Sequence, residues 1–265
     1  ILDLKNKIIT QIYKKPSLDK NAIFQKCINW GKSLKQYISS TEILLFNELA
    51  KNKNLLIESA QGTMLDLDHG TYPFVTSSSP SVGGIYTGLG ISPRTVVKVI
   101  GVFKAYSTRV GSGPLPTELN NNIGEQIRKI AWEYGTTTGR ARRVGWFDGM
   151  AAKHSAIIND FSSIIITRLD VLDGFETINI CVGYELNGKK IANFPSDSTI
   201  LDKCKPIYET LPGWSTPTSS KTSFASLPKE AVNYIKRIEQ ITTKPVHLIS
   251  TGPKREETIT IEKLL

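Results

Sequence analysis

The chain has 265 residues, a net charge of +9 and a hydrophobic content of 40%. This composition is ordinary for a globular protein and disfavours low-complexity classes. No uninterrupted apolar run approaches the roughly 18 residues of a membrane span. The three cysteines, Cys27, Cys181 and Cys204, lack the spacing of a zinc site or of a disulfide framework. We therefore expect a cytoplasmic protein with reduced thiols, no membrane partner and no metal ligands in this chain.

The positive charge raises the question of nucleic-acid binding, because basic proteins have affinity for phosphate backbones. Lysine and arginine are dispersed, however, in short pairs such as Lys14-Lys15 and Lys189-Lys190. No aromatic residues alternate with a basic stripe, as a nucleic-acid surface would favour. We expect no nucleic-acid partner, and the charge would instead help to attract anionic nucleotides.

The first part of the chain predicts a helical subdomain over residues 1–53. Ile1, Leu4, Ile8 and Ile12 lie near one face of a helix, and helical patterns continue over residues 21–39 and 41–51. Ser40 or Thr41 would cap the last of these helices. The remainder, residues 54–265, is predicted to form one continuous α/β region that binds nucleotide and substrate.

The α/β region begins with an apolar run, residues 54–57, which predicts a buried strand. Residues 58–84 follow, and they consist almost entirely of small, hydroxyl, acidic and glycine residues. Ligands of open α/β sheets sit at the carboxyl ends of strands, so this loop is a candidate site. Asp66 and Asp68 could indicate a metal or an acid–base pair. We expect instead that their carboxylates accept hydrogen bonds from loop N–H groups, and that His69 is a satisfied loop histidine.

Strands and helices then alternate along the chain. Three consecutive isoleucines in residues 163–167 are typical of a strand buried on both faces. The alternation predicts an α/β fold with a mainly parallel central sheet flanked by helices. The predicted elements are helices over 124–134, 147–159 and 227–242, strands over 163–167, 177–185 and 246–250, a turn at Asn187-Gly188, and an irregular segment over 195–226.

Several sequence motifs carry a family resemblance: ESAQGTMLDLDHGTYPFVTSS at 58–78, KAYSTRVGSGPLPTE at 104–118, GTTTGRARRVGWFD at 135–148, TRLDVLDG at 167–174, PIYETLPGW at 206–214 and STGPKRE at 250–256. With them, the chain resembles the adenylosuccinate synthetase family. Members of this family join inosine monophosphate (IMP) to L-aspartate at the expense of GTP, in the first committed step of AMP synthesis. The resemblance implies a fold related to P-loop NTPases, a cytoplasmic homodimer, and Mg²⁺ acting with GTP in the full enzyme.

The resemblance also implies roles for individual residues, beginning with IMP. Gln61, Thr76, Val110 and Arg140 would contact it. The Gln61 amide offers a donor and an acceptor to the edge of hypoxanthine, and the Thr76 hydroxyl suits a phosphate oxygen. Without the resemblance, Gln61 and Thr76 would belong to an ordinary hydrogen-bonded loop, and Val110 would be a buried valine.

A second group would bind aspartate. Arginine binds carboxylates through a fork of N–H donors, and a loop bracketed by glycines can close over a substrate. The alternative for this segment is a solvated basic turn. The residues that the resemblance assigns to aspartate are Thr136, Thr137, Thr138, Gly139, Arg140 and Arg142.

A third group would bind GTP. The Asp170 carboxylate can accept from N1–H and from the exocyclic amine of guanine, whereas adenine would leave the charge unpaired. The family usually has lysine at the position of Arg168, and either cation can lie along the base. Asp173 is expected to be only a turn or cap residue. The residues that the resemblance assigns to GTP are Arg142, Arg168, Leu169, Asp170, Ser250, Thr251 and Gly252.

One family motif, a glycine-rich phosphate loop of the G-D-E-G-K-G type, does not occur in the sequence. The resemblance therefore implies a carboxyl-terminal portion with the amino-terminal part missing. The acid and base of the family, and its Mg²⁺ ligands, would lie outside this chain, so no catalytic residue is assigned here. Two functions stay open. One is GTP-dependent formation of adenylosuccinate, GDP and phosphate; the other is a non-catalytic GTP- and IMP-binding chain or a subunit that needs an amino-terminal partner.

Overall fold

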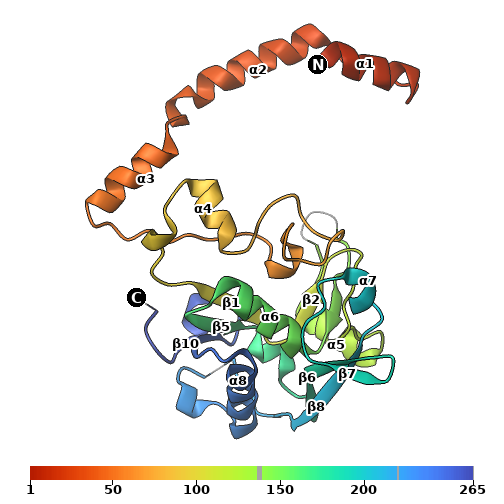
Figure 1. Cartoon of the computed structure of the whole chain (residues 1–265), viewed down its shortest axis with the longest axis vertical. Helices are drawn as coiled ribbons and strands as arrows, with labels where there is room; N and C mark the ends of the chain where they lie inside the picture. Colours follow the sequence, from red (N-terminus) through yellow and green to blue (C-terminus); the bar gives the residue numbers. More distant parts are fainter. Residues whose placement is uncertain (136–138, 220, 265) are drawn as a thin grey trace. The chain divides into compact units, whose positions relative to one another are not determined.

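The computed structural model describes residues 1–135, 139–219 and 221–264. The chain divides into two compact units, Ile1–Leu55 and Leu56–Leu265 (Figure 1). Each unit is built differently. The first contains only helices, and the second contains all of the described strands together with the remaining helices.

The first unit consists of helices α1 (Leu2–Gln11), α2 (Lys20–Leu34) and α3 (Thr41–Ala50), with a 3-10 turn over Lys35–Tyr37. The predicted helices are therefore confirmed. Asp19 caps α2 by accepting from the backbone N–H of Ala22. Asn6 of α1 holds the segment before α2, because its side chain accepts from Leu18 N at 2.8 Å and donates to Leu18 O at 3.0 Å.

A central sheet organises the second unit. Strands β1 (Ile100–Lys104), β5 (Ser163–Thr167) and β9 (Val246–Ser250) are parallel neighbours, and β10 (Thr258–Thr260) pairs antiparallel to β9. Lys104 is in register with Thr167, so β1 and β5 end side by side. The mixed α/β fold and its mainly parallel central sheet are confirmed. The loops that follow the three parallel strands consequently leave from one edge of the sheet.

The core of this unit lies between the central sheet and helices α6 (Gly149–Asn159) and α8 (Lys229–Thr242), which pack against each other. Ile164 and Ile166 of β5 are fully buried, whereas Ile165 is only partly buried. The two faces of this strand are therefore covered unequally, which corrects the expectation of complete burial.

Helix α5 (Asn122–Ile130) ends earlier than predicted. Its capping residue is Ala131, and Trp132 adopts a left-handed backbone with φ of 51°. A non-glycine residue in that conformation stops a helix. The chain turns here and delivers Glu133 toward the end of β1.

A second sheet contains β6 (Thr177–Leu186), β7 (Lys189–Ile191), β8 (Lys205–Pro212) and the short β4 (Phe147–Asp148). The predicted turn between β6 and β7 is confirmed, since Asn187 and Gly188 both have positive φ. The prediction of an irregular segment over 195–226 is wrong. It contains helix α7 (Ser198–Leu201) and strand β8, in which Pro206 and Pro212 are tolerated because β8 pairs only with β6, at an edge of the sheet.

The predicted strand over residues 54–57 is also wrong. These residues have no regular structure, and Leu56 is 87% exposed. A segment with strand propensity forms a strand only where a neighbouring strand accepts and donates its backbone hydrogen bonds. None of the strands described in this chain pairs with residues 54–57. None of the helices in the described part of the chain combines the length and the hydropathy of a membrane-spanning segment.

The remaining elements are short: β2 (Ser107–Arg109) paired with β3 (Arg143–Gly145), helix α4 (Gly83–Leu89), and 3-10 turns over Thr63–Leu65, Pro93–Thr95, Leu169–Leu172, Phe224–Ser226 and Arg255–Glu257.

Candidate functional site

The candidate nucleotide site lies at the carboxyl edge of the central sheet. Arg168 follows β5 with a left-handed backbone, φ 63°, and turns the chain into the Leu169–Leu172 helical turn. Thr251 follows β9, the next strand of the sheet, and is fully buried. The residues assigned to GTP by resemblance therefore leave the sheet from two adjacent strands. This is where open α/β sheets bind ligands.

Asp170 has an unusual environment within this edge. Its Oδ1 is buried and accepts no hydrogen bond from the described part of the chain. Burial raises the pKa of Asp170 most, whereas a hydrogen bond from its own backbone N–H and the attraction of Arg168 lower it, and the carboxylates of Asp173 and Glu257 add a smaller rise. A buried acceptor without a donor costs stability. Such a group marks a place where a ligand can supply the missing donor.

The loop after β9 is held in one shape by its own hydrogen bonds. Thr251 donates to Glu257 O through its backbone N–H at 2.9 Å and its hydroxyl at 3.2 Å. The Ser250 hydroxyl donates to Gly252 O at 2.8 Å, and Glu257 Oε2 accepts from Lys254 N at 2.8 Å. The loop that follows β9 is thus preorganised.

Asp173 does more than the predicted turn or cap residue. Its carboxylate accepts from Trp214 Nε1 at 2.6 Å, from Thr218 N at 2.8 Å and from the Thr218 hydroxyl at 3.0 Å. It therefore anchors the segment after β8 to the loop that carries Asp170. The signal of this role in the sequence is indirect, namely that PIYETLPGW and TRLDVLDG both belong to the family motifs.

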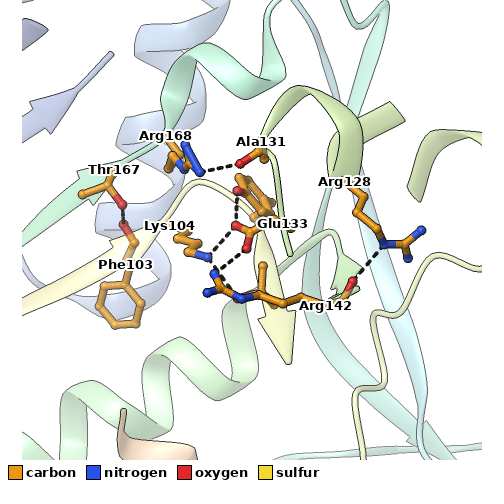
Figure 2. A network of polar contacts seen from close by, with 10 residues as sticks. Phe103, Lys104, Arg128, Ala131, Glu133, Arg142, Thr167 and Arg168 are labelled. Atoms are coloured by element: carbon orange, nitrogen blue, oxygen red, sulfur yellow. Dashed lines mark hydrogen bonds and ion pairs between the residues drawn. The ribbon is translucent and has the colours of Figure 1, made fainter. Parts of the chain in front are cut away.

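A network centred on Glu133 links the same edge to Arg142 (Figure 2). Glu133 is fully buried, and its Oε1 accepts from Lys104 Nζ at 2.5 Å and from Tyr106 Oη at 2.6 Å. Its Oε2 accepts from Arg142 Nη1 at 2.7 Å. Burial alone would raise the pKa of Glu133, but these three donors outweigh burial and lower it. Glu133 is consequently an ionised carboxylate shared by two cations.

The same residue closes the base of the loop assigned to aspartate. Arg142 N donates to Glu133 O at 2.9 Å, and inside this pair Gly135 N donates to Arg140 O at 2.8 Å. Gly139 has φ of 63°, a conformation that favours glycine. Thr136, Thr137 and Thr138 lie outside the described residues. Of the predicted group, the structure thus places Gly139, Arg140 and Arg142 on a hairpin-like loop.

The loop over residues 58–84 is fixed by Asp66, as predicted. The fully buried carboxylate accepts from Asp68 N at 2.9 Å, His69 N at 3.0 Å, Ser81 N at 3.1 Å and the Ser81 hydroxyl at 2.7 Å. Burial works to raise the pKa of Asp66, but these hydrogen bonds lower it. The expectation of loop N–H bonding is confirmed for Asp66, which is therefore a structural carboxylate.

Two further side chains attach this loop to the rest of the unit. Asn159, at the end of α6, donates to the Thr63 hydroxyl at 2.9 Å and accepts from Val82 N at 2.8 Å. Arg109 donates to Thr71 Oγ1 at 3.0 Å and to Phe74 O at 2.9 Å. The loop is thus held near both of its ends and in its middle.

The residues assigned to IMP sit on this scaffold. Gln61 is exposed, with φ of 59°, and Thr76 is partly buried, with its N–H donating to Leu65 O. Val110 is 63% exposed, so its interpretation as a buried valine is wrong. Its neighbour Arg109 points inward to hold residues 71–74, which turns Val110 outward. Gln61, Thr76 and Val110 make no hydrogen bond with one another among the described residues.

A metal ion bound by the chain alone would need several His, Cys, Asp or Glu side chains close together. Within the described ranges, no group of three or more His, Cys, Asp or Glu side chains lies close enough to hold a metal ion.

The fold and the loops at its carboxyl edge define an α/β protein of the ligand-binding, open-sheet class. Residues 1–259 match the protein family described as adenylosuccinate synthetase. The chain belongs to the adenylosuccinate synthetase family.

Individual relatives agree with this assignment. The chain is 47% identical over 263 residues to adenylosuccinate synthetase of Alkaliphilus metalliredigens, covering 99% of this chain and 62% of the relative. It is 45% identical over 260 residues to that of Geobacter sulfurreducens, covering 98% and 60%. The structure of fully ligated adenylosuccinate synthetase from Plasmodium falciparum superposes with a TM-score of 0.91 at 37% identity, covering 98% of this chain and 63% of that one. The chain spans about three-fifths of the length of these relatives.

Proposed function

We propose that this chain forms the guanine-nucleotide, IMP and aspartate sites of an adenylosuccinate synthetase. The protein that contains it would ligate IMP and L-aspartate to adenylosuccinate, with conversion of GTP to GDP and phosphate. In that reaction GTP phosphorylates the 6-oxygen of IMP, and the amine of aspartate then displaces the phosphate. Family membership supports the overall activity, and the structure supports the choice of nucleotide.

The observation that carries the proposal is the buried, unpartnered Oδ1 of Asp170. Guanine presents two adjacent N–H donors, at N1 and at the 2-amine, which a carboxylate can accept together. Adenine presents an acceptor at N1 and would leave the carboxylate charge buried and unpaired. The loop of Ser250, Thr251 and Gly252, on the neighbouring strand, would flank the base. Arg168 would lie along it.

The other substrates are proposed to bind around this nucleotide. Gln61, Thr76 and Val110 would contact IMP, with Arg140 reaching it from the 135–142 loop. Thr136, Thr137, Thr138, Gly139, Arg140 and Arg142 would surround the aspartate carboxylates, and Arg142 would also reach GTP. We propose a cytoplasmic homodimer, as the family resemblance implies, with Mg²⁺ accompanying GTP. The described residues bind and orient substrates, and none of them is assigned as the catalytic acid or base.

The experiment is to supply the protein with IMP, L-aspartate and one of GTP, ITP or ATP, and to quantify adenylosuccinate by chromatography. GTP should be used best. ITP, which lacks the 2-amine, should have a lower kcat/KM, and ATP should be used least. Equal use of the three nucleotides would contradict the assignment of Asp170. Binding of GTP and IMP without product would instead favour a non-catalytic nucleotide-binding protein or a subunit that needs a partner.

A further inference from the structure

Three cations gather at the carboxyl edge of the central sheet. Lys104 ends β1, Arg168 follows β5, and Arg142 lies at the base of the 135–142 loop. Burial lowers the pKa of Lys104, and repulsion from Arg142 and Arg168 lowers it further, against the attraction of Glu133. Arg142 and Arg168 therefore both lie within electrostatic reach of Lys104, and Lys104 and Arg142 share one buried carboxylate.

Glu133 cannot itself contact a ligand, because its side chain is fully buried. Both of its carboxylate oxygens are occupied, Oε1 by Lys104 and Tyr106 and Oε2 by Arg142. The two cations keep part of their surface open, since the Lys104 side chain is 29% exposed and that of Arg142 is 32% exposed. In Arg142, Nε is buried and has no partner among the described residues.

The orientation of the two cations has a physical cause. Two adjacent positive side chains repel each other and would move apart into solvent. Figure 2 shows Lys104, at the end of β1, and Arg142, at the base of the 135–142 loop, both directed at Glu133. The carboxylate offsets their repulsion and fixes both side chains, so that less conformational freedom is lost when a ligand binds.

We propose that Glu133 is a positioning residue that holds the Lys104 ammonium and the Arg142 guanidinium side by side as a platform for substrate oxyanions. The identity of the oxyanion rests on the proposed function: it is either a phosphate of the guanine nucleotide or a carboxylate of aspartate. Both accept hydrogen bonds from an arginine fork and an ammonium group. Lys104 thereby becomes a further substrate-binding residue, beyond the residues assigned by resemblance.

The test uses three ligands on the intact protein, each measured by titration calorimetry. Inorganic tripolyphosphate carries oxyanions without guanine, guanosine carries guanine without oxyanions, and L-aspartate with IMP present supplies the carboxylates. The variants are Glu133→Gln and Lys104→Gln. The matched control is Tyr106→Phe, which removes a hydrogen bond to the same Oε1 but leaves both cations held. Circular dichroism and thermal melting verify folding.

Glu133→Gln and Lys104→Gln should each weaken binding of tripolyphosphate, or of aspartate, by tenfold or more. Guanosine affinity should stay within twofold, and Tyr106→Phe should bind all three ligands like the wild type. A loss confined to tripolyphosphate assigns the platform to the nucleotide, and a loss confined to aspartate assigns it to the amino acid. Lys104 is partly exposed, so Lys104→Gln gives the result even if Glu133→Gln does not fold.

Unchanged binding of both oxyanion ligands in Lys104→Gln would overturn the proposal. An equal loss for guanosine and for the oxyanions would also overturn it, because that pattern indicates a general structural role. A wild-type protein that binds tripolyphosphate or aspartate but not guanosine would contradict the guanine site while leaving the platform intact. The two proposals therefore fail on different ligands.

Discussion

Replacing Asp170 by asparagine should change ligand affinity and protein stability in opposite directions. The substitution keeps the shape of the side chain but removes its charge. Wild-type Asp170 has a buried Oδ1 without a donor, and the carboxylates of Asp173 and Glu257 lie near enough to raise its pKa, after the larger effect of burial. The charge is therefore unfavourable in the ligand-free protein. Under the proposed function, the charge is stabilised when guanine supplies hydrogen-bond donors.

The magnitudes follow from these contacts. Asparagine keeps one acceptor for guanine but loses the second charge-assisted hydrogen bond, which is worth about 2–3 kcal/mol. Guanosine should therefore bind roughly 30–150-fold more weakly, because each 1.4 kcal/mol is a factor of ten. In the absence of ligand, relief of the buried charge should raise the free energy of unfolding by about 1 kcal/mol.

The assay combines guanosine titration with urea unfolding of the ligand-free protein. Asp173→Asn is the matched control, because the carboxylate of Asp173 is already filled by Trp214 and Thr218. That variant should lose stability, whereas Asp170→Asn should gain it. If Asp170→Asn were destabilised like the control and bound guanosine normally, the interpretation of Asp170 as a ligand carboxylate would be refuted.

Three further outcomes are expected. Arg140→Ala should raise the KM for aspartate roughly 10–150-fold, because it removes a charge-assisted contact of about 1.5–3 kcal/mol. Initial rates measured at varied aspartate concentration will give this KM. An unchanged KM would contradict the assignment of Arg140 to the aspartate site. Asp66→Asn should lower the free energy of unfolding by about 2 kcal/mol at pH 7. Because hydrogen bonds hold the pKa of Asp66 below its unfolded value, this difference is fully present above about pH 4 and is lost as the pH falls through the lowered pKa. A difference that did not shrink at all between pH 5 and pH 2 in urea titrations would contradict this account. Guanosine affinity should rise with pH through the raised pKa of Asp170, with a midpoint above the usual value of about 3.9; a pH-independent dissociation constant between pH 4 and 7 would argue against ionised Asp170 as the acceptor.

The sequence predicted the parts of this fold that depend on local pattern. The helices of residues 1–53, the strand of consecutive isoleucines and the Asn187-Gly188 turn all follow from spacing and turn chemistry. Elements that depend on a neighbour were mispredicted. Strand β8 exists because β6 pairs along its whole length, and residues 54–57 stay irregular because no described strand pairs with them.

The residues of the candidate site divide in the same way, into those that local sequence predicts and those that depend on distant neighbours. Asp66 could be predicted as a loop carboxylate, because its donors lie within a few residues or in the same loop. The role of Glu133 could not be predicted from the sequence. Its three partners lie on β1, on the segment before β2 and on the far side of the 135–142 loop. A single charged residue near the end of a helix carries no signal of such a network. Only the folded arrangement brings Lys104 and Arg142 to it.

Hydrogen-bond satisfaction separates two uses of buried carboxylates in this chain. Asp66, Glu133 and Asp173 accept from several donors of the chain itself, and each of them holds a loop in place. Asp170 differs from these three. Among the carboxylate oxygens of the described residues, its Oδ1 is the one that is buried without a hydrogen-bond donor. Burial alone would not distinguish these groups, since all four are removed at least partly from solvent. The filled acceptors stabilise the loops that carry them, and the open acceptor of Asp170 is the one that we propose for a ligand. Substitutions of the filled carboxylates should therefore change stability first, and substitution of Asp170 should change ligand choice first.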